Sequence, residues 1–212
     1  MAIKAIVFDF WGTLVEQGTY SPIKQSYKIL SPKMTYQEFV QKFEEVLMTK
    51  HYEDQKRAFE EVCKSFGIAC SDFIISKLIG LWNKNKLLTR PYPETIDVLN
   101  ALKAKGIKLG LISNSPAFST EVVLEKFAID KILDAVVLSC CNGALKQSGE
   151  LLKKALELLK AKPEEALMVG DSIETDMEGA RLVGVEGILI DRLGKRDWPK
   201  KIRNLKEIEN FL

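Results

Sequence analysis

The sequence of 212 residues lacks the features of a membrane, secreted or nucleic-acid-binding protein. No run approaches the roughly 18 consecutive apolar residues of a membrane-spanning helix. The N-terminus runs straight into an apolar strand pattern and lacks the parts of a secretion signal. Lysine plus arginine number 31 and aspartate plus glutamate 29, spread along the chain without basic tracts. We therefore expect a cytoplasmic protein with neither a membrane nor a nucleic acid as partner.

Cysteine and histidine are also scarce. The four cysteines, Cys63, Cys70, Cys140 and Cys141, match no paired zinc-ligand spacing. Adjacent Cys140 and Cys141 lie in an apolar run, which predicts two small, buried or half-buried side chains. His51 is the only histidine, and we expect it at a surface position of a helix. The sequence thus gives no reason to expect a zinc site.

Short apolar runs alternate with helical patterns over most of the chain. Runs of this length are typical of strands buried on both faces of a parallel sheet. The five runs are 5–8, 108–112, 135–138, 166–169 and 187–190. Thr175 with Glu178 three residues later predicts a capping box that opens the helix after the fourth strand. The alternation predicts an α/β fold with a doubly wound, Rossmann-like parallel sheet of about five strands.

A helical segment interrupts this alternation. From about residue 20 to 88 apolar residues recur at helical spacing, as at Phe39, Phe43 and Leu47. The segment is too small to be a convincing free-standing domain. We therefore predict a core of residues 1–15 and 90–212, into which an all-helical cap of residues 16–89 is inserted.

Polar side chains that suit phosphoryl chemistry follow the predicted strands. In an open parallel sheet, ligands bind beyond the carboxyl ends of the strands. The residues in question are Asp9, Gly12, Thr13, Ser113, Asn114, Lys146, Asp171 and Asp176. A carboxylate can act as the nucleophile in phosphoryl transfer, and Mg²⁺ lowers the repulsion between two anions. A hydroxyl and an ammonium can hold the remaining phosphate oxygens.

The order of these residues resembles the four motifs of the haloacid dehalogenase-like superfamily, and the resemblance covers nearly the whole chain. The first motif is matched by Asp9-Phe10-Trp11-Gly12-Thr13-Leu14 and the second by Ser113-Asn114. Lys146 matches the third, and Gly170-Asp171-Ser172 with Asp176 the fourth. The helical segment matches the cap that this superfamily inserts after its first motif.

The resemblance implies a role for each residue. Asp9 is the implied nucleophile, Thr13 and Ser113 contact the transferring group, and Lys146 orients nucleophile and substrate. Asp9, Asp171, Asp176 and the main-chain carbonyl of Trp11 are implied to hold Mg²⁺. Trp11, Gly12 and Asn114 are implied substrate contacts, and Glu16 matches a carboxylate that often follows the first motif.

One position departs from the pattern of the phosphatases. They usually carry a second aspartate, a general acid and base, two residues after the nucleophile, where this chain has Trp11. Loss of a positioned acid costs roughly 10²–10⁴-fold in rate. Haloacid dehalogenases commonly have an aromatic residue there, but they need no metal and usually have serine in place of Asp171. Phosphonoacetaldehyde hydrolases use a cap lysine; Lys50 lies at a plausible depth, although a solvated position is more typical.

We therefore expect a Mg²⁺-dependent hydrolase, a phosphatase that acts on a small phosphorylated metabolite through an aspartyl-phosphate. The first alternative is a 2-haloacid dehalogenase in which Asp9 attacks carbon. The second is a protein that binds a phosphorylated ligand and has lost turnover. We expect a monomer or a small homo-oligomer, and the sequence leaves the substrate open.

Overall fold

The protein contains one parallel sheet between two layers of helices, with a group of four helices at one end. The structure, a computed structural model, describes residues 2–16, 21–69 and 71–212. The sheet has the strand order β3-β2-β1-β4-β5-β6, and all neighbouring strands are parallel. The strands are β1 (Ala5–Phe8), β2 (Lys108–Ser113), β3 (Ala135–Leu138), β4 (Ala166–Gly170), β5 (Glu186–Ile190) and β6 (Lys201–Ile202). The predicted α/β class is confirmed, with β6 as an additional strand.

The central strand β1 explains why apolar runs mark this sheet. It lies between β2 and β4, with Val7 opposite both Gly110 and Met168. All four of its side chains are buried. A strand covered on both faces has no exposed side to fill with polar residues, so its sequence reads as a continuous apolar run.

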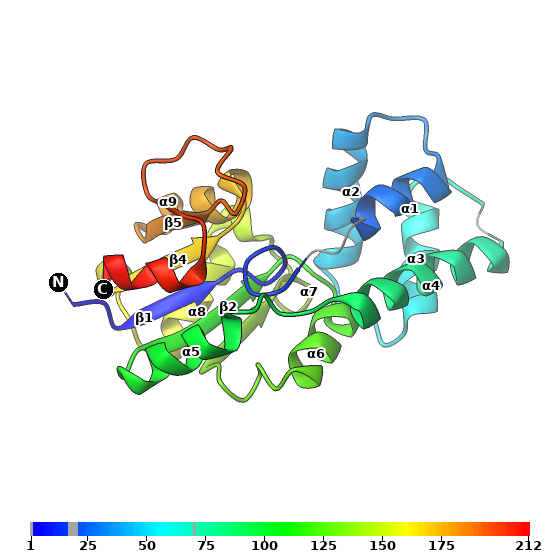
Figure 1. Ribbon diagram of the computed structural model, residues 1–212. Coiled ribbons are helices and arrows are strands. Elements are labelled where there is room, and N and C mark those ends of the chain that lie inside the picture. Colours follow the sequence, from blue (N-terminus) through cyan, green and yellow to red (C-terminus); the bar gives the residue numbers. More distant parts are fainter. Residues whose placement is uncertain (1, 17–20, 70) are drawn as a thin grey trace.

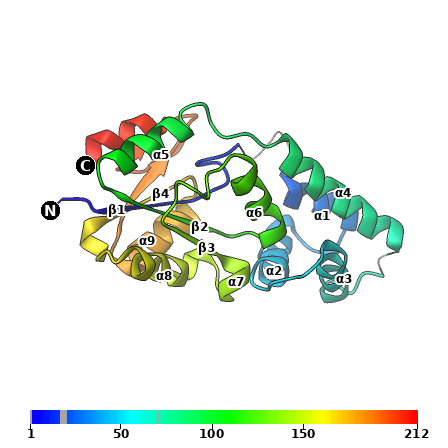
Figure 2. The same ribbon diagram turned by 90° about the horizontal axis from the view of Figure 1, so that it is seen from below.

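Helices cover both faces of the sheet. The helices α5 (Thr95–Ala104) and α6 (Ala117–Lys126) and the 3₁₀ helix η4 (Leu205–Phe211) pack on one face, around Ile6 and Phe8. The helices α8 (Glu150–Leu159) and α9 (Glu178–Val183) pack on the other, around Val7 and Met168. Figures 1 and 2 show the two layers from perpendicular directions. The sheet is therefore closed to water on both faces, and its edges and strand ends are left for ligands.

The group of four helices has a core of its own. It comprises α1 (Pro22–Leu30), α2 (Tyr36–Met48), α3 (Gln55–Ser65) and α4 (Asp72–Leu88). Aromatic side chains meet at its centre, with Phe43 and Trp82 stacked at a ring-centroid distance of 6.1 Å. In Figures 1 and 2 this group lies beyond the carboxyl ends of the strands. We propose residues 16–89, which contain these helices, as the cap.

Short helical turns fill the strand–helix connections. They are α7 (Ser139–Asn142), η1 (Lys146–Ser148), η2 (Pro163–Glu165) and the π-helix η3 (Ile173–Met177). The predicted capping box at Thr175 is wrong, because Ser172 is the N-cap and accepts the Thr175 N–H at 3.3 Å. His51 is exposed, as expected, but lies in the loop after α2. Among the described residues, no helix has the length and apolar character that crossing a membrane requires.

Candidate active site

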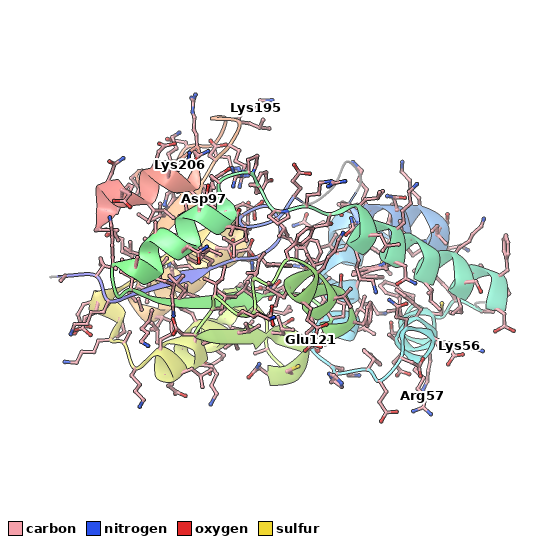
Figure 3. The ribbon with its side chains drawn as sticks, turned by 60° about the horizontal axis from the view of Figure 1, so that its bottom comes forward. Lys56, Arg57, Asp97, Glu121, Lys195 and Lys206 are labelled. Atoms are coloured by element: carbon pink, nitrogen blue, oxygen red, sulfur yellow. The ribbon has the colours of Figure 1, made fainter. Side chains whose placement is uncertain are left out.

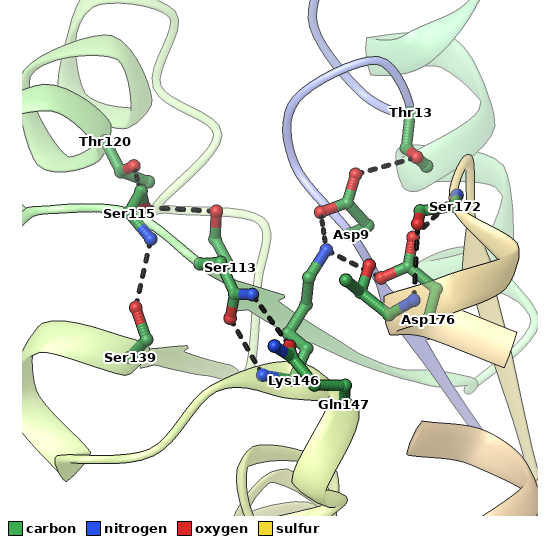
Figure 4. Close-up of polar contacts among 12 residues, drawn as sticks. Asp9, Thr13, Ser113, Ser115, Thr120, Ser139, Lys146, Gln147, Ser172 and Asp176 are labelled. Carbon is green, nitrogen blue, oxygen red and sulfur yellow. Dashed lines mark hydrogen bonds and ion pairs between the residues drawn. The ribbon is translucent and has the colours of Figure 1, made fainter. Parts of the chain in front are cut away.

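The polar residues that follow β1 and β4 converge with the first residue of η1 at one end of the sheet. Asp9 comes directly after β1, and its side chain is 3% exposed. Its Oδ2 accepts a hydrogen bond from Thr13 Oγ1 at 3.0 Å, and its Oδ1 lies 2.5 Å from the Lys146 ammonium. Figure 4 shows Asp9, Lys146 and Asp176 pointing toward one another from separate segments. The structure thus brings together residues that lie more than 130 positions apart in the sequence.

Lys146 joins the two buried carboxylates. Its ammonium lies 2.6 Å from Asp176 Oδ1 as well as 2.5 Å from Asp9 Oδ1. The side chain is almost entirely buried, and so are those of Asp9 and Asp176. A buried ion pair stabilises a site only where geometry and further hydrogen bonds offset the desolvation of the charges. This lysine therefore fixes the position of Asp9 and balances part of its charge.

Two glycines make room for this arrangement. A Cβ at Gly170, the last residue of β4, would lie 2.3 Å from the Asp176 carboxylate. A Cβ at Gly179 would lie 2.4 Å from the main-chain oxygen of Lys146. The π-helix η3 turns Asp176 back over the end of β4, where the Ser172 N–H donates to its Oδ2 at 3.0 Å. Any side chain at Gly170 would displace Asp176.

Arg192, which the sequence analysis did not identify, holds the loop that carries Thr13. Its guanidinium donates to the Thr13 carbonyl at 2.9 Å and to Glu94 at 2.7 Å. It also stacks on the Tyr92 ring at 3.3 Å from the centroid. Gly12 adopts a φ of 87° in this loop, a left-handed conformation that favours glycine. The Thr13 hydroxyl is thereby fixed against Asp9.

Ser113 ends β2 in a network of buried hydroxyls. Its Oγ accepts a hydrogen bond from Ser115 Oγ at 3.0 Å, and Ser115 Oγ lies 2.5 Å from Thr120 Oγ1. The Ser115 N–H donates to Ser139 Oγ at 3.0 Å. Ser115, Thr120 and Ser139 were missed, because a hydroxyl carries no sequence signal for the partner it will meet. The network fixes the Ser113 hydroxyl, with its proton free to point toward a ligand.

The side chain of Asn114 binds η1, the turn that carries Lys146. Its Oδ1 accepts the Lys146 N–H at 2.8 Å, and its Nδ2 donates to Gln147 Oε1 at 3.1 Å. Both ends of the amide thus contact η1. The role of Asn114 as a substrate contact stays a prediction, and its observed contacts position Lys146.

Three carboxylates and one ammonium give this site an excess of negative charge. Burial, followed by repulsion from Asp176 and Asp171, raises the pKa of Asp9 to about 7 even though Lys146 opposes the shift. Burial and Asp176 raise the pKa of Asp171 to about 6. Burial lowers the pKa of Lys146, but attraction to Asp176 and Asp9 outweighs it and raises that pKa overall. A bound cation would reverse the shifts of the two aspartates.

The carboxylates fit a hard divalent cation. One oxygen each from Asp9, Asp171 and Asp176 lies within 4.8 Å of the others. Asp176 Oδ1 is buried and receives no hydrogen bond of acceptable geometry, although the lysine ammonium lies 2.6 Å away. Mg²⁺ prefers oxygen ligands and needs only one or two carboxylates, because it retains several waters. The donor set present is therefore suited to Mg²⁺.

Two hollows open beside the carboxylates, between the strand ends and the four helices. The larger, of about 700 Å³, is lined by Gly12, Glu16 and Asp171 among others, and by Lys84 of α4. The smaller, of about 150 Å³, is lined by Trp11, Ile23, Met48, Trp82, Asn85, Asn114 and Ser115 among others. Trp11 packs edge-to-face on Phe10 with ring centroids 5.1 Å apart. Trp11 is thus one of the side chains that line the smaller hollow.

Comparison with known proteins identifies relatives over most of the chain. A family model for the haloacid dehalogenase-like hydrolases matches residues 3–184. The glyceraldehyde 3-phosphate phosphatase of Methanothermobacter thermautotrophicus is 29% identical, over 89% of this chain and 86% of that one. The phosphoglycolate phosphatase of Aquifex aeolicus is also 29% identical, over 88% and 84%. The crystal structure of a phosphatase from Thermococcus onnurineus superposes with a TM-score of 0.68, at 26% identity over 99% and 97%.

Proposed function

The chain belongs to the haloacid dehalogenase-like hydrolases, and we propose that it hydrolyses a small phosphorylated metabolite through an aspartyl-phosphate on Asp9. The observation that carries this proposal is the position of Asp9. Its carboxylate is held between Thr13 and Lys146 at the strand ends, beside the two further carboxylates Asp171 and Asp176. This combination is what phosphoryl transfer to a carboxylate requires.

In the first half of the reaction a carboxylate oxygen of Asp9 attacks phosphorus. The bond between phosphorus and the leaving oxygen breaks, and the phosphoryl group is transferred to Asp9. Lys146 and Thr13 hold the carboxylate in one orientation. The Ser113 hydroxyl, fixed by Ser115, is a donor for a phosphate oxygen. Donors that are already in place stabilise the charge that develops in the transition state without reorganisation.

In the second half the oxygen of a water molecule attacks phosphorus, and the bond between phosphorus and the Asp9 oxygen breaks. Inorganic phosphate leaves with the water protons that do not pass to solvent, and the Asp9 carboxylate is restored. Asp9, Asp171 and Asp176, with the main-chain carbonyl of Trp11, are the proposed ligands of Mg²⁺. The three buried or half-buried carboxylates, with one oxygen of each within 4.8 Å of the others, support this assignment. When bound, Mg²⁺ neutralises the repulsion between nucleophile and phosphate and polarises the phosphoryl oxygens.

The identity of residue 11 sets which substrates react quickly. An indole cannot give a proton to a departing alkoxide at neutral pH, so esters of ordinary alcohols should react slowly. Substrates whose leaving group needs no proton, such as acyl phosphates and aryl phosphates, avoid this cost. The apolar residues Ile23 and Met48 line the smaller hollow with Trp11 and suit an apolar part of the substrate.

The larger hollow limits the size and charge of the substrate. Its volume of about 700 Å³ accommodates a small metabolite. Lys84 of the cap and Arg196 of the core line it, which favours a substrate with an anionic group besides the phosphate. The related enzymes named for glyceraldehyde 3-phosphate and phosphoglycolate act on small phosphorylated metabolites, as their names state.

The proposal is tested with p-nitrophenyl phosphate, acetyl phosphate and a simple alkyl phosphate, with and without Mg²⁺. We expect turnover of the first two that EDTA abolishes, and slow turnover of the alkyl ester. The Trp11→Asp variant should gain roughly 10²-fold more on the alkyl ester than on acetyl phosphate, because only the alkyl leaving group needs an acid, whereas a base for the attacking water would serve both substrates. Turnover that survives EDTA would contradict the metal-dependent mechanism. Release of halide from a 2-haloacid, in place of phosphatase activity, would favour the dehalogenase. Binding of a phosphorylated ligand without any product would favour the binding protein that has lost turnover.

A further inference from the structure

A second cluster of metal-ligating side chains lies outside the proposed catalytic site. It consists of Cys140 and Cys141 in α7 and His51 in the loop after α2, and we call it the Cys–His cluster. The two sulfur atoms are 3.6 Å apart, and Cys141 Sγ is 3.9 Å from His51 Nδ1. All three ligand atoms lie within 4.8 Å of one another. Three soft or borderline donors therefore converge on one point.

These distances match those around a tetrahedral zinc ion. Zinc–sulfur bonds of about 2.3 Å and zinc–nitrogen bonds of about 2.0–2.1 Å meet at the tetrahedral angle. This geometry places two sulfur ligands about 3.8 Å apart and a sulfur and a nitrogen about 3.6 Å apart. The two separations given above differ from these by about 0.3 Å or less, and the third, between Cys140 and His51, lies within 4.8 Å. Side-chain rotation would therefore be enough to bring the three ligands to one zinc ion.

The cluster joins two parts of the molecule. Cys140 and Cys141 belong to the core, because α7 follows β3 directly, whereas His51 follows the cap helix α2. Figures 1 and 2 both show α2 beside α7, and the two helices are in contact. An ion held by all three side chains would connect cap and core by coordination bonds. Such a link is independent of the apolar contacts that pack the cap.

We propose that Cys140, Cys141 and His51 form a binding site for a soft or borderline divalent ion of the zinc class, which bridges cap and core. Each thiol loses its proton to solvent as its sulfur binds the ion, and neutral His51 donates the lone pair of Nδ1. Three protein ligands leave a fourth position for water or for a carboxylate. Glu121, labelled on α6 in Figure 3, lines a surface hollow together with Cys141 and is the carboxylate that we propose for this position.

The cluster is open to solvent and differs in ligand type from the aspartate site. Cys141 and His51 are exposed, so an ion can reach the cluster from solvent. The oxygen ligands of the aspartate site suit Mg²⁺ and the sulfur ligands suit zinc, so the two sites select different ions.

The test is a titration of the reduced, full-length protein with Co²⁺ alone, because cobalt bound to thiolates gives a charge-transfer band in the near ultraviolet. We expect one equivalent to produce the band and Zn²⁺ to displace it. Cys141→Ser should abolish the band, and His51→Ala should weaken binding by at least about tenfold. Both positions are exposed, so neither change should disturb folding, which a thermal melt verifies.

Two control variants separate this site from other ligands. Asp171→Asn alters the proposed Mg²⁺ site and should leave the cobalt–thiolate band intact. Cys63→Ala removes a sulfur in the cap core and should leave it intact as well. Absence of the band in the wild type, or a band retained in Cys141→Ser, would overturn the site. Equal affinities of wild type and His51→Ala for Co²⁺ would contradict the proposal that the ion bridges cap and core.

Discussion

The floor of the proposed active site and the cap surface above it are built in different ways. On the floor, Asp9, Lys146 and Asp176 are buried, and each is held by contacts from a different segment of the core. Above it, the cap contributes Ile23, Met48 and Trp82, apolar side chains that line a small hollow. Preorganised charge on the floor determines the type of reaction, whereas the shape of the hollow selects the substrate. Mutations in the two regions should therefore change different kinetic constants.

Among the changes that leave Asp9 in place, we expect Lys146→Met on the floor of the site to lower activity and stability the most. The change leaves Asp9 and Asp176 without their shared cation, so we expect kcat to fall about 10²–10³-fold. The metal-free protein should also lose about 3–5 kcal/mol of stability, because two buried carboxylates lose their partner. Chemical denaturation and steady-state kinetics with acetyl phosphate measure both effects. Lys153→Met, on the exposed surface of α8, is the matched control and should change neither.

A change in the cap hollow should affect selectivity rather than chemistry. Ile23→Ala removes part of the wall near Trp11, so p-nitrophenyl phosphate should lose about tenfold in kcat/KM. Acetyl phosphate, whose leaving group is smaller, should keep its kcat. Ile74→Ala, at another partly buried position of the cap core, provides the comparison. An equal loss of kcat for both substrates would remove the distinction between floor and cap.

The smallest expected effect is the dependence of Tm on pH in the metal-free protein. In the metal-free protein burial raises the pKa of Asp9 to about 7 and that of Asp171 to about 6, from 3.8. Between pH 4 and 7 the folded state therefore binds more protons than the unfolded chain, and the free energy of unfolding falls as pH rises. We expect Tm without metal to be several degrees, about 3 °C or more, lower at pH 7.5 than at pH 5.5.

Magnesium should remove much of this pH dependence, because a cation stabilises the ionised carboxylates. Thermal melts at the two pH values, with EDTA or with Mg²⁺, measure the difference. In Asp171→Asn one of the two raised groups is gone, so the drop in Tm without metal should be smaller. A Tm that rises with pH in the metal-free wild type would contradict the raised pKa values of Asp9 and Asp171.

The sequence was sufficient to predict the parts of the fold that depend on buried strands. β1 and β4 are apolar runs because both of their faces are covered, and Asp9 and Asp171 follow them directly. The strand β6 was missed because Lys201–Ile202 is only two residues long and has no pattern to recognise. The π-helix was missed because Thr175 and Glu178 carry the spacing of a capping box, while the Ser172 side chain takes the cap.

Contacts between distant segments were beyond the reach of the sequence. Arg192 donates a hydrogen bond to the carbonyl of Thr13, which lies 179 positions earlier in the sequence. No local pattern around either residue predicts this contact. The Cys–His cluster is a second example, because Cys141 lies 90 positions after His51. A spacing rule for zinc ligands compares positions along the chain, and it cannot detect ligands that meet only when the cap folds against the core.

The most direct test of the account is whether Asp9 becomes phosphorylated. The protein is mixed with acetyl phosphate and Mg²⁺, quenched in acid during steady turnover, digested and analysed by mass spectrometry. The proposed mechanism predicts one phosphoryl group on the peptide that contains Asp9. It also predicts no adduct in Asp9→Asn, with turnover reduced by on the order of 10⁴-fold, and normal behaviour of Asp97→Asn on the exposed side of α5 (Figure 3). Turnover in Asp9→Asn near the wild-type rate, or an adduct on another residue, would contradict it.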